Sequence, residues 1–146
     1  MVNFRRMKIG DLDAIYRDPE IRSIITTSTK EPKFSVVIEE DNYIRGGASG
    51  YLIENAAFMQ NIVVKIHKDS TVYKDGLIRS MIHFLELDGV DFLFVVEEDS
   101  IYEDIGFCRL QGDECFFSNF EEALSDEFLD SKIVYWISLK KFFEEK

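Results

Sequence analysis

Alternating and continuous apolar runs along the chain predict a series of β-strands. The runs at 56–66 and 90–96 are continuous, which is typical of strands buried on both faces. The run at 42–55 contains Gly46, Gly47 and Gly50, which indicate a bulge or a turn within that strand. The predicted strands cover residues 2–7, 34–41, 42–55, 56–66, 90–96 and 132–139.

Apolar residues spaced three and four positions apart predict helices between these strands. From Gly76 onward the apolar residues share one face, and Gly89 marks the end of that helix. A later segment begins with the S-x-x-E pattern of a capping box, at Ser100 and Glu103, and ends at Gly106. The predicted helices cover residues 9–18, 19–25, 76–89, 100–106 and 118–124.

The order of these elements predicts one mixed domain over residues 1–146. The strands of the N-terminal half follow one another closely enough to pair antiparallel. The strand at 56–66, the helix at 76–89 and the strand at 90–96 form a right-handed crossover, in which the two strands are parallel. The pattern therefore predicts an α/β (α+β) fold. Repeats, low-complexity runs and linker-like stretches are absent from the sequence.

Composition narrows the range of partners. With 146 residues and 46% hydrophobic residues, the chain has enough apolar material for a single core. The formal net charge of -11 repels nucleic acid and anionic lipid, so neither is an expected partner. The same charge favours cationic small molecules or basic peptides.

Neither a metal site nor a targeting segment is evident. Cys108 and Cys115 do not form a CxxC pair, and His67 and His83 lie far from them in sequence, so we expect free thiols and no metal. No stretch is apolar for the roughly 18 residues that a membrane span needs. The N-terminus lacks the apolar region of a signal peptide, so a cytoplasmic location is expected.

The segment Val72–Ser80 leaves two interpretations open. A glycine followed by an apolar helical pattern is typical of a phosphate-binding loop and also of an ordinary core helix. Between Lys65 and Arg79 there are two more cations than acids, in a chain that is otherwise strongly acidic. That local excess favours an anion, although solvated lysines at strand and loop ends would give the same count.

The order of elements, together with the Y-x-x-x-G-F segment Tyr102–Phe107, resembles the GNAT family of N-acetyltransferases. The resemblance covers nearly the whole chain, from the opening strand and helix to the closing strand at 132–139. It implies a mostly antiparallel central sheet with a parallel, splayed strand–helix–strand crossover and helices on both faces. It also implies transfer of an acyl group, normally acetyl, from acetyl-CoA to a primary amine, without a metal.

The resemblance also implies where coenzyme A would bind. In the family, the pantetheine arm pairs with the central strand through main-chain hydrogen bonds, and a Gln/Arg-x-x-Gly-x-Gly/Ala loop holds the pyrophosphate. Of that loop pattern only Gly76 is present, because Tyr73 and Ile78 replace the other two positions. The implied cofactor residues are Val63, Val64, Ile66, Lys74, Asp75, Gly76, Leu77, Ile78 and Arg79.

Two residues are candidates for the chemistry. Tyr102 matches the tyrosine that often protonates the departing CoA sulfur in the family, and a core tyrosine is the alternative. Glu54 precedes the central strand, where family members often place a carboxylate base, and an ordinary surface glutamate is the alternative.

The acceptor and the assembly are less defined. From Glu97 to Asp130 there are twelve acids and one base, Arg109, which would attract a cationic amine or simply form a solvated acidic face. The pairs Phe116–Phe117 and Phe142–Phe143 are candidates for a homodimer surface or for the core. A second hypothesis for the whole chain is a catalytically degenerate module of the same fold that binds acyl-CoA or a protein.

Overall fold

The computed structural model describes residues 1–25, 32–65, 68–110 and 135–144, and its strands form one mixed sheet. Neighbouring strands follow the order β1-β2-β3-β4-β5-β7-β6. Every neighbouring pair is antiparallel except β4 and β5, which run parallel, as the sequence predicts. The strands are β1 (Val2–Arg6), β2 (Lys33–Glu40), β3 (Tyr43–Ile53), β4 (Ala56–Val64), β5 (Phe92–Val95), β6 (Cys108–Arg109) and β7 (Tyr135–Ser138).

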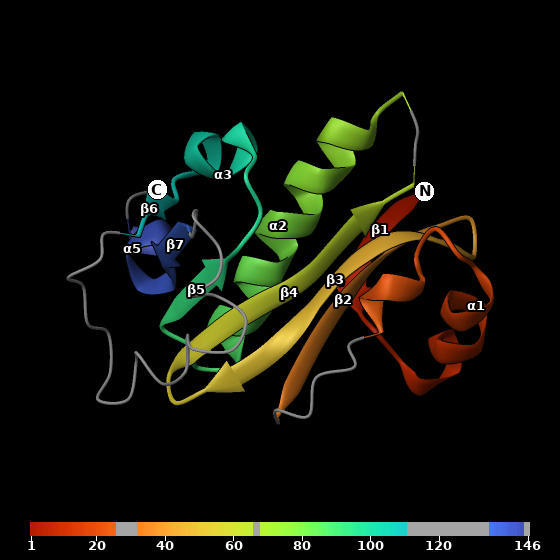
Figure 1. Cartoon of the computed structure of the whole chain (residues 1–146), viewed down its shortest axis with the longest axis horizontal. Helices are drawn as coiled ribbons and strands as arrows, with labels where there is room; N and C mark the ends of the chain where they lie inside the picture. Colours follow the sequence, from red (N-terminus) through yellow and green to blue (C-terminus); the bar gives the residue numbers. More distant parts are fainter. Residues whose placement is uncertain (26–31, 66–67, 111–134, 145–146) are drawn as a thin grey trace.

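Helices cover both faces of this sheet (Figure 1). One face carries α2 (Ser70–Leu87), α3 (Ser100–Ile105) and α5 (Leu139–Glu144), whose apolar residues share a core cluster. The other face carries α1 (Leu12–Arg17) and the short 3-10 helices η1 (Ile9–Asp11) and η2 (Arg22–Ile24).

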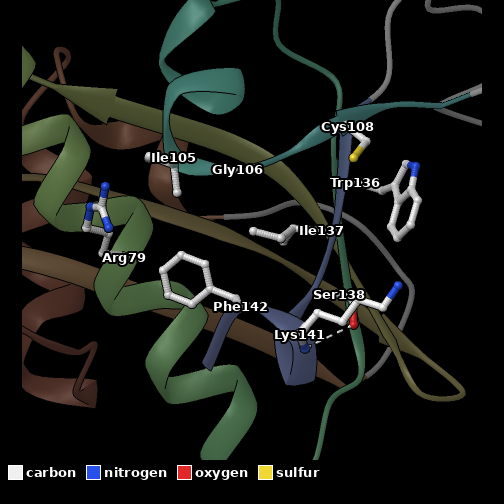
Figure 2. A pocket seen from close by; sticks show the side chains of 9 residues that line it. All are labelled: Arg79, Ile105, Gly106, Cys108, Trp136, Ile137, Ser138, Lys141 and Phe142. Carbon is white, nitrogen blue, oxygen red and sulfur yellow. Dashed lines mark hydrogen bonds between the residues drawn. The ribbon is translucent and has the colours of Figure 1, made fainter. Parts of the chain in front are cut away.

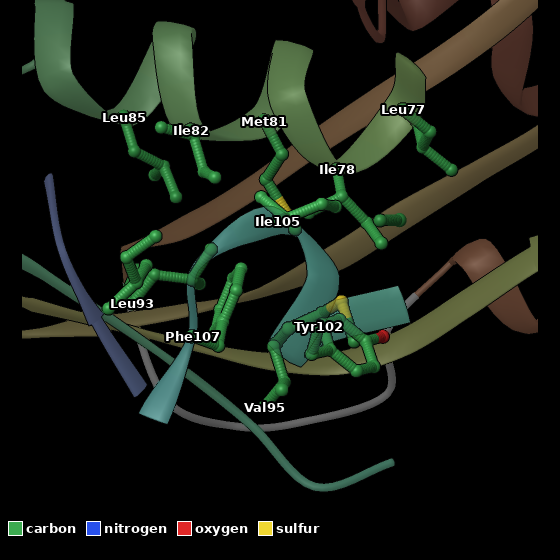
Figure 3. Close-up of a cluster of buried hydrophobic side chains, with 14 of the residues drawn as sticks. Leu77, Ile78, Met81, Ile82, Leu85, Leu93, Val95, Tyr102, Ile105 and Phe107 are labelled. Atoms are coloured by element: carbon green, nitrogen blue, oxygen red, sulfur yellow. The ribbon is translucent and has the colours of Figure 1, made fainter. Parts of the chain in front are cut away.

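Strand alternation sends successive β2 side chains into different cores. Val36 and Ile38 belong to the cluster under α2, whereas Val37 packs with Ile15 and Ile24 on the opposite face. Figure 3 shows the larger cluster, where the buried face of α2 lies against the side chains of α3 and β5. Burial of each such side chain contributes about 1.5–3 kcal/mol, so this cluster fixes how α2 and α3 sit relative to each other.

A bulge in β4 marks the point where β4 and β5 separate. Ser49 pairs with Asn61 and Gly50 pairs with Met59, so Gln60 is an extra residue in β4. β5 pairs with β4 only as far as Met59. Because a bulge bends its strand, β4 leaves β5 here and continues to Val64 alongside α2 (Figure 1). β3 has a bulge of its own, because Ile38 pairs with Gly46 and Glu39 with Ile44, which confirms the irregularity that its glycines predict.

Gly50 is the residue that allows this close approach of β3 and β4. A Cβ atom at Gly50 would lie 1.9 Å from the carbonyl oxygen of Phe58 and 2.9 Å from the Cα of Met59, and both atoms are backbone. We expect Gly50→Ala to lower the free energy of unfolding by roughly 2–3 kcal/mol, measured by urea denaturation. Gly10→Ala is the matched control, because a Cβ atom at Gly10 meets nothing within 4 Å. Equal stability of the two variants would contradict the close approach.

The central helix begins earlier than predicted. The apolar pattern predicts a start at Gly76, whereas α2 begins at Ser70 with Asp69 as its N-cap. The first turns carry few apolar residues, so periodicity does not detect them. Gly76 lies in the second turn, and a Cβ atom there would lie 2.5 Å from the ring of Phe4 in β1. The missing side chain at Gly76 therefore makes room for Phe4.

Smaller differences concern helix ends. The predicted helix at 19–25 is only the 3-10 turn η2. α3 is capped by Asp99, whose side chain accepts a hydrogen bond from the backbone N–H of Ile101, so the predicted cap at Ser100 is wrong by one residue. The closing strand is followed by α5, which the sequence pattern did not predict, and Phe142 and Phe143 of α5 pack against the large core cluster.

Several sequence predictions fall outside the described residues. They concern Ile66, His67, Cys115, the pair Phe116–Phe117 and the helix predicted at 118–124. Among the helices that the structure describes, none is both long and apolar enough to cross a membrane.

Candidate active site

Beyond the bulge, β4 presents an open edge towards the gap that β5 leaves. The backbone N–H of Lys65 donates to the carbonyl oxygen of Arg45 in β3, at 2.8 Å. Backbone groups alternate in direction along a strand, so Val63 also faces β3, whereas Ile62 and Val64 face the other way. No strand in the described part of the chain pairs with them there. An extended ligand could add to this edge as a strand does.

A pocket of about 270 Å³ lies where the two strands part. Gln60 and Asn61 line it from β4, Glu97 lines it just after β5, and Ser23 of η2 lines the opposite side. Among the described residues that line it, Glu97 is the charged one. A pocket with amide and hydroxyl groups and one carboxylate suits a polar or cationic molecule.

Glu97 connects this pocket to Tyr102 and Lys74. The Tyr102 hydroxyl donates to Oε1 of Glu97 at 2.9 Å, and Nζ of Lys74 donates to the same oxygen at 2.5 Å. Lys74 also donates to Asp99 at 2.7 Å. Oε1 takes both bonds to Glu97, and Oε2 has no hydrogen-bond partner among the described residues. The second oxygen is therefore available to a molecule in the pocket.

Packing holds the Tyr102 ring in place. Tyr102 is completely buried, stacks on Tyr135 with 5.5 Å between ring centroids, and meets the edge of Phe107 at 5.2 Å. In Figure 3 the ring lies within the cluster beside Phe107. The Y-x-x-x-G-F segment thus contributes both ends of an aromatic contact, and Gly106, with a φ of 130°, turns the chain between them. The hydroxyl has one fixed direction, towards Glu97.

Burial and charge keep this tyrosine protonated. Burial, followed by the negative charge of Glu97 and the hydrogen bond to it, raises the pKa of Tyr102 far above its usual value. Burial would lower the pKa of Lys74, but its hydrogen bonds to Asp99 and Glu97 outweigh that effect and raise it. The Lys74 hydrogen bond lowers the pKa of Asp99. At neutral pH Tyr102 is therefore a phenol, Lys74 an ammonium and Asp99 a carboxylate.

The first turn of α2 offers backbone donors close to the open edge. The helix begins six residues after the end of β4, and the side chain of Asp69 does not cap it by a hydrogen bond. The N–H groups of the first helical turn have no partner within a helix, and an anion such as a pyrophosphate can accept from them. The donors that a phosphate would use are thus at Ser70–Val72.

The predicted phosphate loop at Lys74–Arg79 is not at the helix start. Leu77 and Ile78 are completely buried in the core, and Gly76 faces Phe4. Asp75 and Arg79 pair with each other across one turn, at 2.8 Å. These residues lie inside a helix whose backbone N–H groups are already bonded, so the interpretation of Val72–Ser80 as a core helix is the one that the structure favours.

Of the four cations counted near this segment, Lys68 lies at the helix start, next to the N-cap Asp69, and the other three pair with acids. Lys65 pairs with Asp18, Lys74 with Glu97 and Asp99, and Arg79 with Asp75. Of the predicted pantetheine partners, Val64 faces the open edge and Val63 faces β3.

Glu54 is not brought together with Tyr102. It lies in the turn between β3 and β4, with a φ of 56°, at the opposite end of β4 from the bulge. Gln60 lies six positions further along the chain, which is about 20 Å at the usual rise of a strand. The carboxylate near Tyr102 is Glu97, which sequence reasoning counted only as one of many acids. Its position at the carboxyl end of a parallel strand was the available signal.

Comparison with known proteins finds similar structures but no similar sequences. No protein-family model matches the chain. None of the curated proteins matches it either. Among solved structures, a GNAT-family acetyltransferase from Staphylococcus aureus Mu50 has a TM-score of 0.69 at 11% identity, over 95% of this chain and 99% of its own. The chain has the GNAT fold.

Two further structures support the GNAT fold. The ribosomal-protein-S18-alanine N-acetyltransferase of Escherichia coli has a TM-score of 0.67 at 17% identity, over 95% of this chain and 94% of its own. N-acetylglutamate synthase from Neisseria gonorrhoeae, solved with coenzyme A and N-acetylglutamate, has a TM-score of 0.69 at 16% identity over 95% of this chain. The present chain spans 35% of the length of that synthase. The resemblance drawn from Tyr102–Phe107 and the order of elements is confirmed for the fold.

Proposed function

We propose that the protein is an acyl-CoA-dependent N-acyltransferase that moves an acetyl group from acetyl-CoA to a primary amine of a small molecule or peptide. One observation carries the proposal. The open edge of β4 at Ile62 and Val64 ends beside a pocket lined by Glu97, whose Oε1 accepts a hydrogen bond from the buried hydroxyl of Tyr102. Structures of the same fold were solved with coenzyme A, which supports acyl-CoA as the donor.

The residues of this chain fit the donor in two places. Val64 can pair with an extended pantetheine arm through its backbone, and the first-turn N–H groups of α2 can donate hydrogen bonds to the pyrophosphate. Neither contact needs a particular side chain, so the loss of the Gln/Arg-x-x-Gly-x-Gly/Ala pattern does not remove them. Lys74 bridges Glu97 and Asp99 through its two hydrogen bonds, beside the pocket.

The same residues can carry the proton across the reaction. Glu97 takes a proton from the acceptor amine through Oε2, which leaves the nitrogen lone pair able to form the new amide bond as the thioester C–S bond breaks. Tyr102 gives its proton to the departing sulfur and regains one from Glu97, to which it is already bonded. For a protonated amine the balance is one ammonium and one acetyl thioester in, and one amide, one thiol and one proton released to solvent out.

Glu97 also bears on the acceptor. It is the charged residue among the described residues that line the pocket, so a cationic amine would be attracted to it. The intact Tyr102–Glu97 pair favours catalysis over a module that binds acyl-CoA without turnover.

Binding of acetyl-CoA is the first test. We expect micromolar, salt-sensitive binding by calorimetric titration, because a pyrophosphate at a helix N-terminus is bound electrostatically. Val64→Pro should weaken it roughly tenfold, since it removes one backbone donor on the open edge and leaves the β3 side of the strand intact.

Val64→Thr is the matched control, because it keeps the backbone N–H and the β-branched shape. It should bind acetyl-CoA as the parent does. Absence of binding at millimolar acetyl-CoA would contradict the proposed function. Equal affinities of Val64→Pro and Val64→Thr would contradict strand-like binding at β4.

A further inference from the structure

A second pocket, of about 460 Å³, lies on the α2 face beside α5, and we call it the α5 pocket. Figure 2 shows its lining side chains, which come from α2, from the last turn of α3, from β6 and β7, and from α5. It shares no lining residue with the pocket at Glu97. Its volume lies within the range of ligand sites, which is about 300–1,000 Å³.

The walls of the α5 pocket are largely apolar. Ile105, Ile137 and Phe142 lie on one side in Figure 2, and the indole of Trp136 lies on the other. β6 pairs with β7 only at Tyr135 and Trp136, so the β7 edge beside the pocket has no strand partner among the described residues. The pocket therefore offers an apolar surface that a ligand of moderate size can cover.

The charge of this pocket is opposite to that of the molecule. Among the described residues that line it, the charged ones are Arg79 and Lys141, in a chain with a net charge of -11. Arg79 donates through Nε to Asp75, which does not line the pocket. The two terminal nitrogens of Arg79 are therefore left to bind a ligand. Lys141 has no ion pair with any other residue that the structure describes. By contrast, the remaining described pockets carry carboxylates.

We propose that the α5 pocket binds a small anion with an apolar body, of the class of medium-chain or aromatic carboxylates. The apolar walls would cover the body of the ligand, and Arg79 or Lys141 would pair with its charge. This site is separate from the one in the proposed function and does not depend on it.

The chain contains its own reporter for this site. Trp136 is the only tryptophan in the sequence and lines the α5 pocket, so its fluorescence reports on ligands there. The probes are octanoate and octylammonium, which share an apolar body and differ in charge. General attraction to an acidic protein would favour octylammonium. We expect the reverse: saturable quenching or enhancement by octanoate, with affinity at least about fivefold higher than for octylammonium.

Variants locate the charge that is responsible. Lys141→Gln should weaken octanoate binding about threefold, in line with one exposed charge pair. Lys140→Gln is the matched control, because it removes the same charge from the neighbouring residue of α5, which does not line the pocket. It should bind octanoate as the parent does.

A second measurement uses the exposed thiol of Cys108, which also lines the pocket. In a Cys115→Ser background, octanoate should slow alkylation of Cys108 by iodoacetamide, and octylammonium should not. Equal affinity for the two probes, or equal loss in Lys141→Gln and Lys140→Gln, would overturn the proposal. So would an unchanged rate of Cys108 alkylation at saturating octanoate.

Discussion

Replacing Tyr102 by phenylalanine is expected to lower kcat about 100-fold and to change acetyl-CoA affinity by less than about threefold. The reason is that Tyr102 is completely buried and that, within the described part of the chain, its hydroxyl has a single partner, Glu97. The substitution keeps the ring, its stacking on Tyr135 and its edge contact with Phe107. It removes only the proton that the departing thiolate would take. Steady-state kinetics on the best amine found by screening polyamines and peptides gives the measurement.

Tyr135→Phe provides the matched control for this substitution. It removes one hydroxyl from the same aromatic stack, but that hydroxyl donates to Glu103 at 3.2 Å and not to the pocket. Its kcat should stay within about twofold of the parent. Full activity of Tyr102→Phe would show that the sulfur gains its proton elsewhere. Equal losses in the two variants would assign the effect to packing.

The pH profile separates the acid role further. Because burial and the negative charge of Glu97 raise the pKa of Tyr102, the phenol keeps its proton above the usual value of about 10. The proton-bound form is therefore present over the whole working range. We therefore expect kcat of the parent not to fall between pH 7 and pH 10 through loss of the Tyr102 proton. A fall in this range that is present in the parent and absent from Tyr102→Phe would contradict this.

Regular pattern made most of the fold predictable. The apolar run within residues 34–41 and the continuous run at 90–96 correctly indicate strands, and the glycines of β3 correctly indicate a bulge. These predictions succeed because side chains on a sheet point alternately into two apolar layers, so a buried strand appears in the sequence as a run of apolar residues. α5 leaves little trace, because it has only six residues.

The candidate site was less predictable, because its residues carry no pattern of their own. Ser70–Val72 contains no apolar stripe, so the helix start was placed at Gly76, whose small size is needed for Phe4 instead. Glu54 was chosen for its position before β4, but strand length puts it at the wrong end. Glu97 is one acid among many in the sequence. It lines a pocket because β4 and β5 separate beside it, and the sequence does not show that separation.

Glu97→Gln is expected to lower kcat/KM about 100-fold at pH 7, which is the usual range for loss of a general base. The amide keeps the size of the carboxylate, and its oxygen can still accept from Tyr102 and Lys74. Lys74 also keeps Asp99 as a charged partner, at 2.7 Å. The cluster should therefore stay assembled, and only the ability to take a proton from the amine is lost.

The dependence on pH distinguishes a base from a residue that merely shapes the pocket. A primary amine has a pKa near 10, so at pH 7 nearly all of it must lose a proton before attack. Raising the pH to 9 supplies more neutral amine, and the deficit of Glu97→Gln should shrink at least about fivefold. Glu98→Gln, the same charge change at the adjacent residue, should behave as the parent, because Glu98 lies 4.0 Å from Arg109 and does not line the pocket. A deficit in Glu97→Gln that stays constant from pH 7 to pH 9 would argue that Glu97 holds the pocket together without moving a proton.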